Sequence, residues 1–273
     1  MTAESDSARV PQEAADATVI VPPFPRRKKS RTAIVEFLES LLAAILMALF
    51  LIIFVVQSFE IPSESMAPTL LTGDYLLVNK FIFGGHGAWY ERALPYRDVR
   101  RGEVIVFKYP YDDHPYYVKR VIGLPGDHIR IANQAIYVNG FTAPEPHVVH
   151  DAAYRDPFGD NFPPAFKFVS QRGLRPEWAA VLMEHVVNGE LVVPQGNYFV
   201  MGDNRDHSWD SRYWGFVDRG AIIGRPVGIY WSHDSASDGC AVSGGRRGAT
   251  EFFRAVLHVP RCTRWPRLGH EVH

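Results

Sequence analysis

A long apolar stretch near the N-terminus constrains this chain more than any other feature. From about Val35 to Val56 the sequence is almost entirely Leu, Ile, Ala, Phe and Val, and about 20 such residues can cross a bilayer as a helix. A cleaved signal peptide is the alternative, but it is usually shorter and ends at a small-x-small site, which does not follow Val56. We therefore predict a retained transmembrane helix over residues 33–57.

The charges on either side of this stretch predict its orientation. Residues 26–31 form a dense basic cluster, whereas the next basic residue downstream is Lys80. The positive-inside rule then places the N-terminus in the cytoplasm and everything after Gln57 outside it. Residues 1–32 lack apolar periodicity and are predicted to be a disordered basic tail. Outside the cytoplasm a disulfide between Cys240 and Cys262 is permissible, and the sequence leaves its formation open.

The remainder of the chain favours strands over helices. The 22 Gly and 20 Pro residues punctuate short runs rich in Val, Ile, Tyr and Phe, which is typical of antiparallel strands and hairpins. We predict a mainly β fold, with an antiparallel β-sheet domain over residues 58–140 and 195–240. A Pro-rich block, residues 141–194, is predicted to be an inserted small subdomain with one helix over Pro176–Val187. Residues 241–273 form a basic C-terminal tail, either lying on anionic lipid or solvated.

A loop rich in serine and proline, residues 61–70, follows the apolar stretch closely. Pro62 and Pro68 fix φ and remove two backbone donors, so the loop is rigid and not helical. We interpret Ser65 as a candidate nucleophile. It needs a neighbouring base, because a serine hydroxyl is weakly nucleophilic on its own. An ordinary surface turn is the alternative interpretation.

Two side chains are candidates for that base. Lys119 lies in a strand-like run, where alternation places it on the same face as Tyr117 and Val121. A lysine with its ordinary pKa of about 10.4 is almost entirely charged at neutral pH, so it can act as a base only if burial lowers that pKa. His207 with an aspartate would instead form a Ser/His/Asp triad. A solvent-exposed strand lysine is the structural alternative.

Three segments in order resemble signature motifs of bacterial type I signal peptidases, also called leader peptidases: Ser63–Leu70, Lys119–Asp127 and Gly202–Arg212. The resemblance covers most of residues 59–140 and 198–231. It implies a membrane-bound serine endopeptidase with a Ser/Lys dyad, which removes N-terminal signal peptides from exported preproteins.

The resemblance also implies residue roles. Ser65 would be the nucleophile, Lys119 the general base, the Ser63 hydroxyl and Ser65 amide the oxyanion hole, and Ser208 would orient the lysine by a hydrogen bond. The resemblance also implies substrate pockets, lined by residues from this set: Ile61, Pro62, Met66, Leu70, Tyr117 and Val118. We interpret four charged residues as an ion-pair and turn network that supports the Ser208 loop: Asp203, Arg205, Asp210 and Arg212. Glu64 stands where relatives often have glycine, and we expect it to point outward.

The resemblance implies the bacterial inner (plasma) membrane. The single span and the extracytoplasmic side of the catalytic domain are predicted from the one apolar stretch and its flanking charges. Ser65 follows Val56 by nine positions, a reach of about 30 Å at most. The expected partners are the lipid bilayer and preproteins that carry signal peptides; no metal, organic cofactor or nucleic acid is expected. Two alternatives stay open: a membrane-anchored Ser/His/Asp hydrolase, and an inactive membrane-anchored binding module for exported proteins.

Overall fold

The computed structural model describes residues 33–50, 55–83, 96–109, 111, 116–154, 156–164, 174–234, 237, 240 and 260–273. The predicted tail of residues 1–32 lies outside the described residues, as do residues 241–259. The N-terminal helix and the β-rich remainder form separate units, and each is described by itself.

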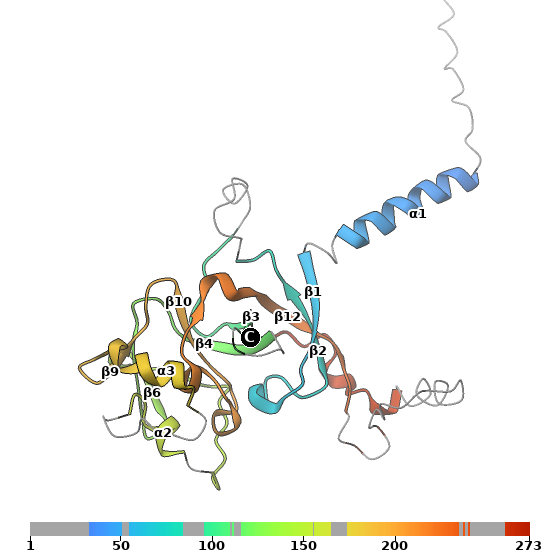
Figure 1. Cartoon of the computed structure of the whole chain (residues 1–273). Coiled ribbons are helices and arrows are strands. Elements are labelled where there is room, and N and C mark those ends of the chain that lie inside the picture. Colours follow the sequence, from blue (N-terminus) through green and yellow to red (C-terminus); the bar gives the residue numbers. More distant parts are fainter. Residues whose placement is uncertain are drawn as a thin grey trace, which may run out of the picture. The chain divides into compact units, whose positions relative to one another are not determined.

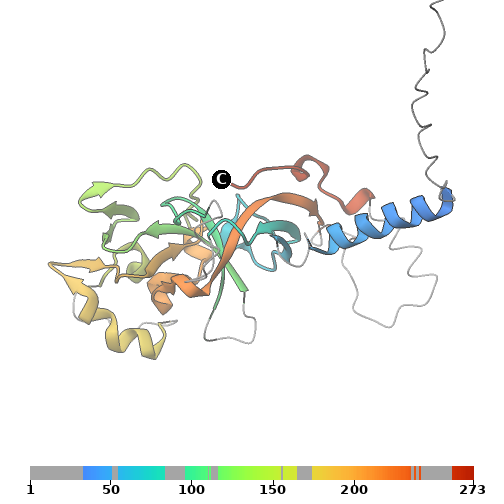
Figure 2. The same ribbon diagram turned by 90° about the horizontal axis from the view of Figure 1, so that it is seen from above.

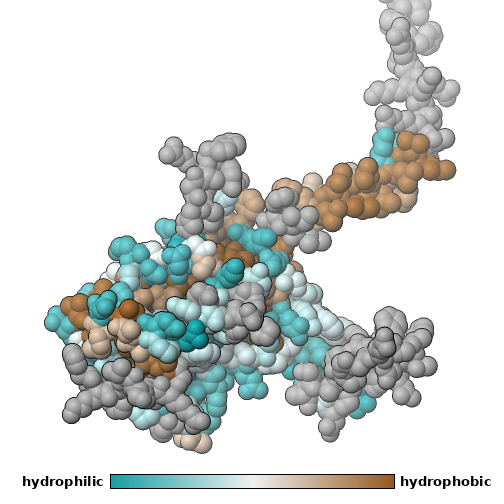
Figure 3. Space-filling view, in the orientation of Figure 1, coloured by the Kyte–Doolittle hydropathy of each residue, from teal (hydrophilic) through white to brown (hydrophobic). Residues whose placement is uncertain are grey.

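The apolar stretch forms a helix that is long enough to cross a membrane. Helix α1 spans Ala33–Phe50, has a mean hydropathy of 2.2, and buries none of its residues against the rest of the protein. Its 18 residues give a length of about 27 Å. Figure 3 shows the helix as largely apolar, with hydrophilic atoms near its N-terminal end. The predicted end at residue 57 is wrong, because strand β1 already begins at Val56.

Seven antiparallel strands form the main sheet, in the order β1-β2-β12-β3-β4-β10-β11, and confirm the predicted fold class. Their bounds are β1 Val56–Glu60, β2 Asp74–Asn79, β3 Val104–Lys108, β4 Tyr116–Gly123, β10 Asn197–Met201, β11 Val217–Asp218 and β12 Ile222–Ser232. The long strand β12 joins the two halves of the sheet by pairing with both β2 and β3. Pro226 sits beside a bulge in β12, where a strand tolerates a residue without an N–H.

A second sheet lies beside the first (Figures 1 and 2) and has the strand order β7-β6-β5-β9-β8. Its strands are β5 His128–Ala132, β6 Ala135–Val138, β7 Phe141–Thr142, β8 Val186–Val187 and β9 Glu190–Val192. The Asn188-Gly189 hairpin has positive φ at both residues, 53° and 81°, as such a tight turn requires. Because this sheet starts at His128, the subdomain begins before the predicted boundary at residue 141.

Helical elements in the β-rich unit are short. They are η2 Glu64–Met66, α2 Pro157–Asp160, α3 Pro176–Val181, η4 Leu182–His185, η5 Arg205–His207, α4 Ser211–Trp214, η6 Arg219–Ala221 and η7 Trp265–Arg267. The helix predicted over Pro176–Val187 is therefore shorter than expected: its last two residues, both β-branched valines, form strand β8.

The end of the chain packs against the main sheet and is not a free tail. Within residues 260–273, Val272 is buried, and the Ile229 amide of β12 donates to the His270 carbonyl at 3.0 Å. Cys240 and Cys262 form a disulfide. The prediction of a solvated tail is wrong for these residues, because the segment packs against residues far away in the sequence. Contact with anionic lipid stays a prediction, and Trp265 is exposed.

Candidate active site

Ser65 lies in η2, at the tip of a loop that residues 61–74 close upon themselves. The Ile61 amide donates to the Asp74 carbonyl at 2.9 Å, and the Gly73 amide donates back to the Ile61 carbonyl at 2.9 Å. Met66 and Leu70 anchor the loop in an apolar cluster of the main sheet. Ser65 is buried, whereas Glu64 points outward as predicted. The loop thus holds the Ser65 hydroxyl in a fixed position.

Lys119 reaches Ser65 from the centre of strand β4. Its ammonium nitrogen Nζ donates a hydrogen bond to Ser65 Oγ, although the two residues are 54 positions apart in the chain. The lysine side chain is buried, which excludes the alternative of an exposed strand lysine. The structure therefore brings together the two residues that the sequence analysis singled out.

The surroundings of Lys119 lower its pKa to about 8. Burial is the main cause, because removing an ammonium from water disfavours the charged form. The positive charge of Arg212 lowers the pKa further, whereas Asp210 and Asp203 oppose both effects. At pH 7 about one tenth of such a lysine is neutral, far more than at its ordinary pKa, and a general base requires this neutral form.

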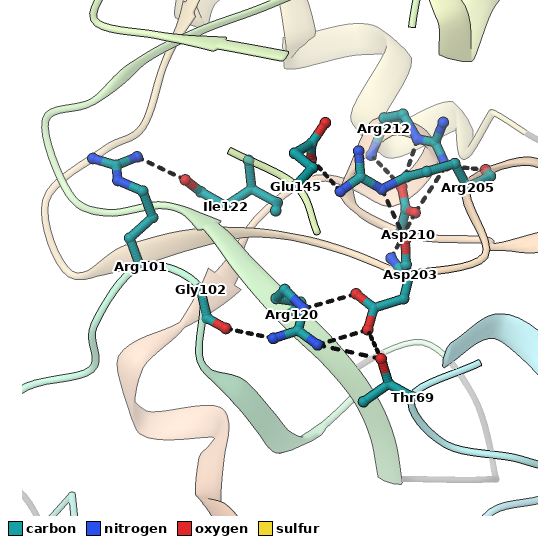
Figure 4. A network of polar contacts seen from close by, with 11 residues as sticks. Thr69, Arg101, Gly102, Arg120, Ile122, Glu145, Asp203, Arg205, Asp210 and Arg212 are labelled. Carbon is teal, nitrogen blue, oxygen red and sulfur yellow. Dashed lines mark hydrogen bonds and ion pairs between the residues drawn. The ribbon is translucent and has the colours of Figure 1, made fainter. Parts of the chain in front are cut away.

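A network of buried ion pairs and hydrogen bonds is formed around Arg120, Asp203 and Arg212 (Figure 4). Arg120, on the opposite face of β4 from Lys119, binds both oxygens of Asp203 at 2.7 Å, and the Thr69 hydroxyl donates to the same carboxylate at 2.5 Å. Asp203 is completely buried, so these partners offset the cost of removing its charge from water. The network thereby connects the serine loop to the strand that carries the lysine.

A second part of the network fixes the turn after β10. Asp210 pairs with Arg212 at 2.9 Å and accepts a hydrogen bond from the Gly202 amide at 3.1 Å. Arg205 pairs with Glu145 and donates to the Gly202 carbonyl at 3.0 Å. The predicted network exists, but Arg120, Thr69 and Glu145 were not predicted as its members. A charged residue within an apolar strand was the only signal for Arg120.

Of the two other serines, Ser63 lies near the nucleophile, whereas Ser208 does not make its predicted contact. Ser63 Oγ lies 3.4 Å from Ser65 Oγ, close enough to contribute to the same site. The predicted hydrogen bond from Ser208 to Lys119 is not formed: the Ser208 hydroxyl is buried without a partner among the described residues. Ser208 instead packs against Gly202, next to the Ser65 carbonyl.

A groove of about 560 Å³ opens beside the dyad between β1, the start of the serine loop and the first half of β4. Five of the six predicted pocket residues line it: Ile61, Pro62, Met66, Tyr117 and Val118. Leu70 does not, because its side chain is fully buried in the apolar cluster below. Strand β1 is the edge of the sheet, and β10 pairs only with β4 residues 120–123. Backbone groups on both walls are therefore open to an extended peptide.

His207 belongs to a separate pair. Its Nε2 lies 3.3 Å from Asp151 Oδ2, and both side chains are exposed. The hydroxyl of Ser65 is engaged by Lys119, so the geometry does not favour a triad through His207. Within the described ranges, no group of three or more His, Cys, Asp or Glu side chains is arranged to hold a metal ion.

The chain is similar to a family of peptidases over most of its length. The family model described as "Signal peptidase, peptidase S26" matches residues 34–231. A signal peptidase I of Pseudomonas aeruginosa is 34% identical over 218 residues, which cover 73% of each chain. A signal peptidase I of Rickettsia typhi is 32% identical, covering 75% of this chain and 83% of the relative.

A crystal structure of a signal peptidase I from Enterococcus faecalis is 28% identical and covers 47% of this chain and 97% of the other, with a TM-score of 0.34. The match of the family model spans both the serine loop and the strand with the buried lysine. With its extent and the identity to the bacterial relatives, it shows that the chain belongs to the signal peptidase family, peptidase S26.

Proposed function

We propose that Ser65 and Lys119 are the catalytic dyad of a membrane-anchored endopeptidase that removes signal peptides from exported preproteins. The activity class follows from the family. The observation that supports these two residues is the hydrogen bond between the lysine amine and the serine hydroxyl inside a buried site. A lysine of lowered pKa is the activating base that such a serine needs.

Cleavage then proceeds as an acyl transfer. Neutral Lys119 takes the proton of Ser65 Oγ, the oxygen attacks the scissile carbonyl, and the protonated lysine returns its proton to the leaving amine. A water molecule, deprotonated by the same lysine, then attacks the ester. The new carboxylate leaves, and the lysine returns the proton to Ser65 Oγ. The Ser65 amide and the Ser63 hydroxyl would donate to the oxyanion, because the latter already lies 3.4 Å from the nucleophile.

The groove beside the dyad suits an extended peptide with small side chains near the cleaved bond. The edge of β1 and the first half of β4, which pairs with β3 on one side only, offer main-chain hydrogen bonds, while Ile61, Met66 and Val118 form apolar walls. Apolar walls close to the nucleophile limit the size of the substrate side chain that fits. This favours the small residues that precede signal-peptide cleavage sites.

Helix α1 would hold the enzyme in the bacterial inner membrane. The basic cluster of residues 26–31 precedes the helix, and the positive-inside rule then places the β-rich unit on the extracytoplasmic side. Ser65 follows the end of helix α1 at Phe50 by 15 residues, a reach of about 50 Å at most. A preprotein held in the same bilayer by its own apolar segment therefore meets the serine at a high effective concentration.

Replacing the serine tests the dyad against the His207 alternative. In detergent, the full chain with Ser65→Ala is expected to lose cleavage of a preprotein by about 10³-fold or more, because the nucleophile is gone. His207→Ala is expected to cleave within about threefold of the wild-type rate, since its ring pairs with Asp151 outside the dyad. Loss of activity in His207→Ala with a working Ser65→Ala variant would contradict the proposal. Wild-type protein that binds the preprotein but leaves it uncut would favour the inactive binding module.

The pH dependence of kcat/KM provides a second test. Only neutral Lys119 can accept the serine proton, so kcat/KM is expected to rise with pH and level off above its pKa of about 8. Measuring cleavage of a peptide substrate between pH 6 and pH 10 (a window of about two units on each side of 8) locates the midpoint. A midpoint about two units lower would indicate histidine.

A further inference from the structure

The last described segment, residues 260–273, lies beyond the part matched by the family model, residues 34–231. We propose that this segment, here called the C-terminal clamp, positions the serine loop (residues 61–74), and that Arg267 is its main positioning residue. The inference rests on the proposed function, because it gives the clamp a part in the same cleavage reaction. Three independent contacts carry it.

The first contact is a fork formed by Arg267. Its guanidinium binds both carboxylate oxygens of Asp74, at 3.0 Å from Nε to Oδ1 and 2.5 Å from Nη2 to Oδ2. Nη2 also donates to the Thr69 carbonyl at 2.9 Å. Asp74 is fully buried and accepts the Leu71 amide at 2.8 Å. The Arg267 side chain therefore fixes the loop at residues 69 and 74. It also pairs with the buried carboxylate of Asp74, which itself binds the backbone of the loop.

The second contact is made by Arg264. Its Nη1 donates to the Thr72 carbonyl at 2.9 Å, and its backbone amide donates to the Ser232 carbonyl of β12 at 3.0 Å. The disulfide between Cys240 and Cys262 ties the start of the clamp to the same region. The clamp is thus attached to the sheet while two of its arginines hold carbonyls of the serine loop.

The third contact lies at the end of the clamp. Val272 is buried in the apolar cluster that also contains Met66 and Leu70, which flank Ser65 in the loop. The His273 carbonyl accepts a hydrogen bond from Arg120 Nη1 at 2.8 Å, next to Lys119 in β4. Figures 1 and 2 both place this end of the chain close to β4. The clamp therefore touches the loop that carries the serine and the strand that carries the lysine.

These contacts predict an effect on turnover. The Ser65 oxygen must stay aligned with the amine of Lys119, and a misplacement of about 1 Å can cost about 100-fold in rate. The peptide groove, in contrast, is lined by residues 57–63, 65–66 and 116–119 and by no residue of the clamp. Loosening the clamp should therefore lower kcat and leave KM nearly unchanged.

The test measures kcat and KM of full-length variants in detergent, with a synthetic peptide that spans a signal-peptide cleavage site as substrate. Each variant is assayed at a temperature well below its own unfolding midpoint. Arg267→Ala is expected to lower kcat per folded molecule about 10- to 100-fold with KM within about threefold, and Arg267→Lys to recover part of the loss. Val272→Ala, which leaves no buried charge unpaired, is expected to lower kcat about threefold to tenfold and keeps the test valid if Arg267→Ala does not fold. Arg261→Ala is the matched control, because that arginine is exposed in the same segment.

The outcomes separate the clamp from the dyad. If Arg267→Ala and Val272→Ala unfold at lower temperature but keep the kcat of Arg261→Ala, the clamp only stabilises the fold and the inference is overturned. A rise in KM alone overturns it as well. If Ser65→Ala still cleaves the peptide, the proposed function fails first. A wild-type enzyme that needs Ser65 but not Arg267 leaves the dyad standing and removes only the clamp.

Discussion

Replacing Lys119 by methionine is expected to abolish cleavage and, at the same time, to stabilise the folded protein at neutral pH. The amine is the proposed base, so kcat should fall by about 10³-fold or more. Methionine has a similar length and no charge, and it suits a buried site. A gain in stability from removing a catalytic group is the opposite of what loss of an ordinary packed residue would produce.

The expected gain follows from the pKa of the lysine. Folding lowers that pKa from 10.5 to about 8, so the unfolded chain binds the proton more tightly than the folded one. Each pKa unit corresponds to about 1.4 kcal/mol, which makes the cost of the charged lysine roughly 3 kcal/mol at pH 7. Losing the hydrogen bond to Ser65 returns about 1 kcal/mol of this. We expect Lys119→Met to raise the free energy of unfolding by about 2 kcal/mol at pH 7.

The sign of the pH dependence makes this prediction specific. Between pH 8 and pH 10.5 the unfolded state binds more protons than the folded state, so wild-type stability should rise with pH across that window and the advantage of the variant should shrink. Urea unfolding of both proteins at several pH values measures it. Lys108→Met is the control, since that lysine is exposed on β3 and should change neither cleavage nor the pH trend. If Lys119→Met is less stable than the wild type at pH 7, burying the charged lysine does not cost the folded protein the free energy inferred from its pKa.

The two residues of the proposed dyad could be singled out in the sequence because their signals are local. Ser65 stands between two prolines, and Lys119 interrupts an apolar strand; each is visible within a window of about eight residues, the length of a strand. Alternation correctly placed Lys119 and Arg120 on opposite faces of β4. Alternation could not show that both side chains are buried. Burial on both faces requires that other segments cover each face of β4, and those segments lie far away in the chain.

The supporting contacts could not be predicted because they join distant segments. Arg267 binds Asp74 across 193 positions, and nothing in either neighbourhood indicates the other. Leu70 is apolar like Ile61 and Met66 in the same loop. Its side chain is nevertheless fully buried in the core, whereas Met66 also lines the groove. The boundary of the second sheet was missed for the same reason: β5 and β6 look like a continuation of the first sheet until their pairing with β9 and β7 is known.

Gly202 lies closer to neighbouring atoms than an ordinary turn residue does, and Gly202→Ala is expected to lower kcat about 100-fold. A Cβ at this position would lie 2.3 Å from the Ser65 carbonyl oxygen and 2.2 Å from Ser208 Oγ. The Ser208 side chain can rotate, but the carbonyl belongs to the backbone that carries the nucleophile. Gly202 itself cannot retreat easily, because its amide is bound by Asp210 and its carbonyl by Arg205. The serine backbone is therefore the part that must move.

The measurement is again the separation of kcat from KM, since Gly202 does not line the peptide groove. Overpacking of this kind also costs about 1–3 kcal/mol of stability, so the control must be destabilised without a clash at the serine. Gly140→Ala meets this requirement: Gly140 has φ of 81° in the hairpin between β6 and β7, with no atom within 4 Å of the added Cβ, and alanine there is strained by about 1 kcal/mol. We expect Gly140→Ala to keep its turnover. If Gly202→Ala keeps it as well, the backbone of Ser65 has room to shift without losing its alignment with Lys119, and the close approach of the two segments is not what positions the nucleophile.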